Sequence, residues 1–111
     1  MVLKRIVTLD TGSISAGGFV DVWYAPEVNL KLKRIIVVET TANATSLIFM
    51  TFYLGDVPFF FPNVNANLLR HDVPVPITFD LTHSAGVKLT MRITNSDSAA
   101  RRVLIHLVYE E

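Results

Sequence analysis

The sequence predicts an all-β protein built as a single antiparallel β-sandwich. Apolar and polar residues alternate along several segments of strand length, and short clusters of Gly, Asn, Asp, Ser and Pro separate these segments. No segment shows the apolar spacing of an amphipathic helix. A chain of 111 residues has room for one core, so we expect a single domain over residues 1–111.

The expected strands follow one another at short intervals. The first five cover residues 3–9, 18–24, 28–39, 46–54 and 57–61. A loop rich in Asn follows at 62–72, with one helical turn at 66–70. The last three strands cover residues 74–81, 86–94 and 101–109. Turns are predicted where Gly, Asn, Asp, Ser and Pro gather, at residues 10–13, 16–18, 25–27, 55–56, 84–86 and 95–98.

The clearest alternation lies at residues 87–94, where every second side chain is apolar. Residues 75–81 repeat this pattern, but Pro74 and Pro76 cannot donate ladder hydrogen bonds, which places that strand at a sheet edge. The predicted core therefore combines one face of residues 47–54 with the inward residues of these two strands: Val75, Ile77, Phe79, Val87, Leu89, Met91 and Ile93.

Three segments are apolar on both faces, at residues 35–38, 47–54 and 103–108. A small antiparallel domain normally keeps one face of each sheet for water, so these strands predict a subunit that buries its outside against copies of itself or a larger partner. The alternative is that long strands bend to serve both sheets, which would leave a monomer. We expect the interface to centre on the following side chains or their alternates: Ile48, Met50, Phe52, Leu104, His106 and Val108.

Composition favours a protein partner over nucleic acid or an anionic membrane. The chain has ten basic and ten acidic residues, so the charge that would attract nucleic acid or an anionic membrane is absent. Only 18% of the residues are charged, against about 25% in ordinary soluble domains. We therefore expect no nucleic-acid or membrane partner, and a homo-oligomer in which a trimer is favoured. The chain has no Cys, which excludes disulfides, a thiolate nucleophile and Cys-based metal sites.

No motif predicts catalysis, a metal or a cofactor. His71, His83 and His106 are too far apart in sequence for a local metal site, and His106 is expected to be a partly buried, hydrogen-bonded side chain. The His71–Asp72 pair has no partner nucleophile. Asn63, Asn65, Asn67 and Asp72 offer oxygen ligands of the kind that calcium prefers. Only one of the four is a carboxylate, and a calcium loop generally needs several, so we expect these Asn residues to form turns. We expect a protein that is not an enzyme.

Aromatic residues offer the main alternative function. Strand alternation places Phe60 opposite Phe59 and Phe61, which favours packing over a stacking platform. A carbohydrate- or small-ligand-binding face around Trp23 remains the rival interpretation. Its distinguishing feature would be an exposed aromatic pair near an acidic or amide group in a concave face.

The closing strands, at residues 75–81, 86–95 and 102–108, together with residues 52–58, resemble those of small jelly-roll proteins on virus particles. Eight predicted strands match the jelly-roll number. The resemblance implies a trimeric or higher assembly that decorates, cements or builds a capsid, with a larger capsid protein as a further partner. Carbohydrate-binding modules and discoidin-like domains share this architecture, and no functional residue is carried over.

The N-terminal residues lack the apolar stretch of a secretion signal, and no apolar run is long enough to span a bilayer. These features predict a protein of the cytoplasm or of a virion. A mature secreted fragment that carries a new Met remains an open alternative.

Overall fold

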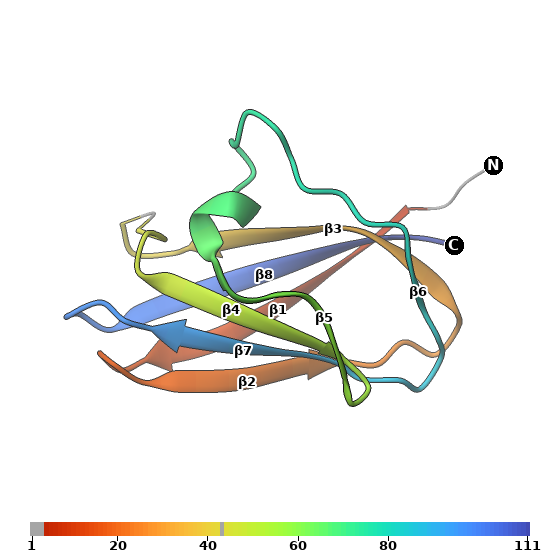
Figure 1. The fold of residues 1–111 in the computed structure, drawn as a ribbon, viewed down its shortest axis with the longest axis horizontal. Coiled ribbons are helices and arrows are strands. Elements are labelled where there is room, and N and C mark those ends of the chain that lie inside the picture. Colours follow the sequence, from red (N-terminus) through yellow and green to blue (C-terminus); the bar gives the residue numbers. More distant parts are fainter. Residues whose placement is uncertain (1–3, 43) are drawn as a thin grey trace.

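The computed structural model describes residues 4–42 and 44–111 and shows two antiparallel sheets packed face to face (Figure 1). The first sheet has the strand order β1 (Lys4–Ile14), β8 (Arg101–Glu110), β3 (Leu30–Glu39), β6 (Leu81–His83). The second has the order β2 (Phe19–Tyr24), β7 (Leu89–Asn95), β4 (Ile48–Leu54), β5 (Val57–Asn65). The predicted antiparallel β-sandwich is confirmed; the expected start of the first strand, Leu3, lies outside the described residues.

The core lies between the sheets and follows the predicted alternation where that alternation is cleanest. Leu89, Met91 and Ile93 of β7 are fully buried, whereas Val87 precedes the strand and is only half-buried. The first sheet meets them with the fully buried odd-numbered residues of β8: Val103, Ile105, Leu107 and Tyr109.

The expected strand at 74–81 is wrong for most of its length. Only Leu81–His83 forms a strand, and Val75, a predicted core residue, is 82% exposed. Ile77 and Phe79 still pack on the core, where the N–H of Phe79 donates to the carbonyl of Lys33 at 2.8 Å. The segment thus passes beside β3 as irregular chain (Figure 1), because two prolines leave it without the donors that a ladder needs.

Two other boundaries differ from the sequence-based expectation. The predicted turn at 10–13 is a bulge inside β1, with Gly12 at a φ of +68°. β5 runs on to Asn65, and the 3₁₀ turn η1 (Ala66–Leu69) follows it within the expected helical turn. Among the described residues, no helix has the length and apolar character that crossing a membrane requires.

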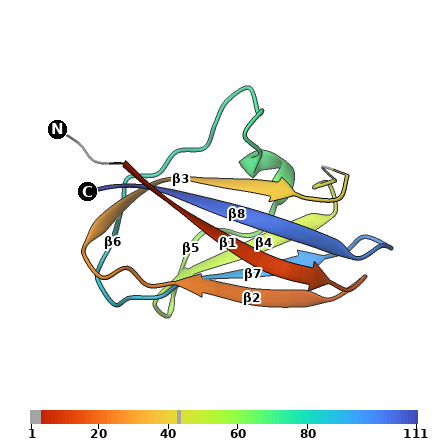
Figure 2. The ribbon, with the colours of Figure 1, turned by 180° about the vertical axis from the view of Figure 1, so that it is seen from behind.

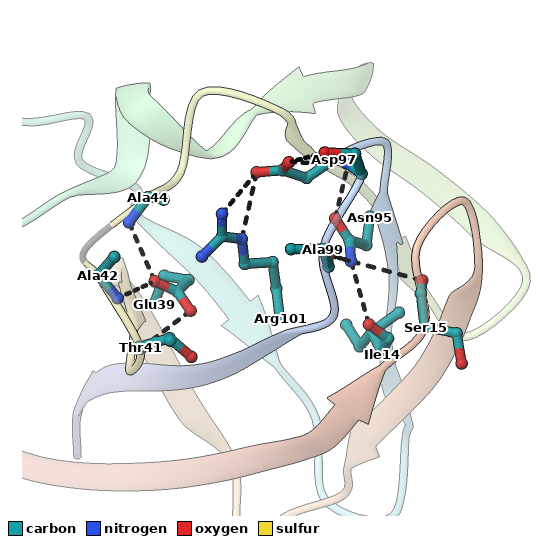
Figure 3. A network of polar contacts seen from close by, with 11 residues as sticks. Ile14, Ser15, Glu39, Thr41, Ala42, Ala44, Asn95, Asp97, Ala99 and Arg101 are labelled. Carbon is teal, nitrogen blue, oxygen red and sulfur yellow. Dashed lines mark hydrogen bonds and ion pairs between the residues drawn. The ribbon is translucent and has the colours of Figure 1, made fainter.

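Two buried polar side chains fix the loops at one end of the sandwich (Figure 3). The carboxylate of Glu39 accepts from the N–H groups of Thr41, Ala42 and Ala44 at 2.8–3.0 Å. The amide of Asn95 donates to the carbonyls of Ile14 at 3.0 Å and Ala99 at 2.9 Å. Because Asn95 lies on β7, it joins the β1–β2 connection to the β7–β8 connection.

A third buried polar group lies deeper in the core. His83 has one ring nitrogen 2.6 Å from the carbonyl of Val87 and the other 2.8 Å from the hydroxyl of Tyr109. A carbonyl can only accept, so Nε2 of His83 carries a proton and donates it to the carbonyl of Val87. Burial raises the pKa of Tyr109, which keeps its hydroxyl protonated.

Candidate functional site

The outer face of the first sheet carries a group of apolar side chains, with Thr8 beside His106 and Arg34 beside Val108. Across β1, β8 and β3, the register aligns Ile6 with Val108, His106 with Ile36, and Leu104 with Val38. Figure 2 shows these three strands side by side on the near side. The name apolar face is used below for Ile6, Ile36, Val38, Leu104, His106 and Val108.

Alternation and a bulge explain why these residues point outward. On β8 the odd-numbered side chains fill the core, so the even-numbered ones stand on the outer face. On β3 the pairing with β8 shifts between Leu32 and Arg34, and the buried positions change from Leu30 and Leu32 to Ile35 and Val37. This bulge moves Ile36 and Val38 to the outer face.

His106 is the polar member of the apolar face. Its Nδ1 lies 2.9 Å from the Oγ1 of Thr8 on the neighbouring strand β1, and the residue is half-buried. The expected partly buried, hydrogen-bonded histidine is confirmed. The bond satisfies one ring nitrogen within the subunit, which lowers the cost of covering this face.

Charged groups gather at the two ends of the apolar face. At one end, Arg102 pairs with Asp10, and hydrogen bonds from Arg102 and from the N–H of Gly12 lower the pKa of Asp10 to about 2. At the other end, Lys33 lies 2.7 Å from Asp80 and 3.7 Å from Glu110, and this raises the pKa of Lys33. An apolar centre with a polar rim is the usual organisation of a protein interface.

The six residues predicted to form the interface lie in two different places. Leu104, His106 and Val108 stand on the outer face of β8. Ile48, Met50 and Phe52 are 0–1% exposed and lie in the core, so they do not point away from it as expected. Their alternates form the outer face of β4: Phe49, Thr51 and Tyr53.

The side chains considered as catalytic groups or metal ligands take part in local contacts. Asp72 binds Arg70 at 3.0 Å, and this hydrogen bond lowers the pKa of Asp72, while His71 is exposed. Asn65 accepts from the N–H of Asn67 and caps η1, as expected for a turn-forming residue. In the described part of the chain, no three His, Asp or Glu side chains gather into a group that could hold a metal ion.

Sequence reasoning missed Ile6, Ile36 and Val38 as members of the candidate interface. Residues 35–38 did carry a signal, since they are apolar on both faces, but their alignment with β8 depends on the β3 bulge. Ile6, at 65% exposed, belongs to an ordinary alternating strand and gave no signal of its own. Comparison of the chain with protein-family models, curated proteins and solved structures found no significant match.

Proposed function

We propose that the protein is a non-catalytic structural subunit that associates with copies of itself through the apolar face. The observation that carries this proposal is the presence of five aliphatic side chains on the outer face of three adjacent strands of one sheet, β1, β8 and β3. Water contact with this surface costs free energy in proportion to its apolar area. Covering it with a second subunit removes that cost.

Size and charge support the same proposal. The subunit has an accessible surface of 6116 Å², and a standard interface buries about 800 Å² on each partner. Strands lie about 4.8 Å apart and each residue advances about 3.3 Å, so three paired strands of about ten residues cover roughly 480 Å² in projection, and the apolar face would be the centre of such an interface. The ion pairs Asp10–Arg102 and Lys33–Asp80 lie at its ends, where they can remain in water.

The proposal extends to the topology and to a role in a virus particle. Strand pairs β1–β8, β2–β7, β3–β6 and β4–β5 are the pairs that form when one long antiparallel hairpin is rolled into two sheets, as in a jelly roll. This pairing supports a jelly roll, and with the resemblance of the closing strands it favours a decoration, cement or minor capsid protein. We propose a trimer that attaches to a larger capsid protein.

The test is the solution mass of the protein, measured by light scattering over about a hundredfold dilution. We expect a stable oligomer, and we expect the variant Val108→Asp to be a folded monomer, because it places a second acidic group on the outer face of β8, beside Ile6 of the apolar face. The matched control is Thr90→Asp, on the outer face of the central strand β7 of the other sheet. It should keep the wild-type mass. A wild-type monomer at every concentration, or a Val108→Asp oligomer, would refute self-association through this face.

A further inference from the structure

The outer face of the second sheet carries two hollows along β4. The first has a volume of about 320 Å³ and is lined by Phe49, Asn63, Thr94 and Ser96. The second has a volume of about 400 Å³ and is mostly apolar, lined by Thr51, Phe52, Tyr53, Pro58, Phe59, Phe60 and Pro62. Both volumes lie in the lower part of the range for ligand pockets, about 300–1,000 Å³.

A large bulge in β5 forms the wall of both hollows. The ladder joins Met50 to Val64 and then Phe52 to Phe59, so residues 60–63 stand opposite the single residue Thr51. Two residues of this bulge have left-handed backbone, Phe60 at a φ of 62° and Asn63 at 51°. A bulky residue rarely adopts this conformation, and strained backbone and bulges concentrate at ligand sites.

The bulge also changes the direction of the phenylalanines. Phe59 and Phe60 were expected on opposite faces, but both pack edge-on against Phe79, with ring centroids 6.2 Å and 5.4 Å away. The left-handed φ of Phe60 is the cause, because it breaks the alternation of the strand. Phe59 and Phe60 therefore line the second hollow and also pack on the core.

The two hollows are neighbours along β4. Asn63 lines the first and Thr51 lines the second, and the N–H of Asn63 donates to the Oγ1 of Thr51 at 3.2 Å. Phe49 and Tyr53 lie on the same face of β4 four residues apart, a distance of about 13 Å along a strand. The name β4 groove is used below for Phe49, Thr51, Tyr53, Asn63, Thr94 and Ser96.

The lining of the β4 groove selects the chemistry of a ligand. None of the described residues that line the two hollows is charged, so a charged ligand would lose hydration there without an opposite charge in return. Phe49, Tyr53, Phe59 and Phe60 offer apolar ring surface, while Thr51, Asn63, Thr94 and Ser96 offer hydroxyl and amide groups that can donate and accept. An elongated, uncharged molecule with apolar ring faces and many hydroxyls fits this combination.

We propose that the β4 groove binds a neutral oligosaccharide. This site is independent of self-association, because the outer face of β4 and the apolar face point in opposite directions: β4 lies toward the viewer in Figure 1 and β1 and β8 do so in Figure 2. The site also differs from the one expected around Trp23. The ammonium group of Lys88 lies 4.3 Å from the centre of the Trp23 ring and covers one of its faces.

The test is a titration followed through backbone amide NMR shifts, with cellobiose, maltose, lactose and chitobiose as probes. Each disaccharide is added to about 20 mM, which is about twenty times a Kd of about 1 mM. At least one should shift the amides of β4 and of residues 60, 61 and 63. Asn63→Gly removes the amide group and keeps a residue that tolerates positive φ, so it should fold and bind about tenfold more weakly.

The control is Thr82→Ala, an exposed position on β6 of the other sheet, which should bind as the wild type does. The proposal is refuted if none of the four disaccharides shifts these amides, or if Asn63→Gly binds with wild-type affinity. A triproline peptide that shifts the groove when no disaccharide does would assign the groove to peptides and also refute it. The mass measurement above is separate, so failure of one proposal leaves the other standing.

Discussion

Replacing Glu39 by Gln should destabilise the protein by an amount that depends on pH. Glu39 is 2% exposed, and its carboxylate accepts from three backbone N–H groups of the chain that follows β3. Burial acts to raise the pKa of this carboxyl group, but the hydrogen bonds from Ala42, Ala44 and Thr41 outweigh it and lower the pKa from 4.5 to about 2. The Gln side chain keeps the shape and loses the charge.

The size of the effect follows from the pKa. A change from 4.5 to about 2 corresponds to about 3 kcal/mol, at about 1.4 kcal/mol for each pH unit. Because the folded-state pKa lies below the unfolded-state value, the carboxylate stabilises the fold fully above pH 4.5. That contribution is lost as the pH falls from 4.5 toward about 2. Wild type and Glu39→Gln should therefore differ by about 3 kcal/mol at pH 7 and become similar near pH 2.

The assay is urea unfolding at several pH values between 2 and 7. All samples have the same protein concentration, because the apparent stability of an oligomer depends on concentration. Glu27→Gln is the matched control, because Glu27 is exposed and the same change there should cost less than about 0.5 kcal/mol. A cost below about 1 kcal/mol for Glu39→Gln at pH 7 would refute the reasoning. So would a cost that stays the same near pH 2.

Two further predictions concern the fold. Asn95→Ala should lower the free energy of unfolding by about 3 kcal/mol, because the carbonyls of Ile14 and Ala99 lose a buried donor. Urea unfolding measures this change, and a cost below about 1 kcal/mol would contradict the role of these two hydrogen bonds. Met91→Ala should cost about 2–5 kcal/mol and Val75→Ala less than about 0.5 kcal/mol, because Met91 is fully buried and Val75 is 82% exposed. Equal costs in the same assay would contradict the observed course of residues 74–80.

The sequence predicted the strands best where apolar alternation coincided with backbone N–H groups free to pair. Residues 89–95 alternate without interruption, and the structure buries the expected face. Residues 75–81 alternate equally well, yet Pro74 and Pro76 remove two donors, and of residues 75–81 only Leu81 pairs with β3. Periodicity describes which side chains could share a face, whereas pairing also requires free N–H groups, so the proline signal should have outweighed the pattern.

The candidate sites depended on information that periodicity lacks. Both faces of residues 47–54 are apolar, so alternation alone could not decide whether Phe52 or Tyr53 points into the core. The β4 groove depends on Phe60 adopting a left-handed backbone, which propensity assigns to Gly or Asn. The apolar face depends on a register shift in β3 that no single residue of the sequence predicts.

The position of β8 has a consequence for how the chain folds. This strand is the last along the described sequence, and it lies between β1 and β3 in the middle of its sheet, where Lys4 pairs with Glu110. During synthesis, β1 and β3 have no partner to bridge them until residues 101–110 leave the ribosome, so the first sheet forms only after translation of β8. Pairing between residues so far apart is slow to form, and the strand edges that wait for β8 are exposed to aggregation during that interval.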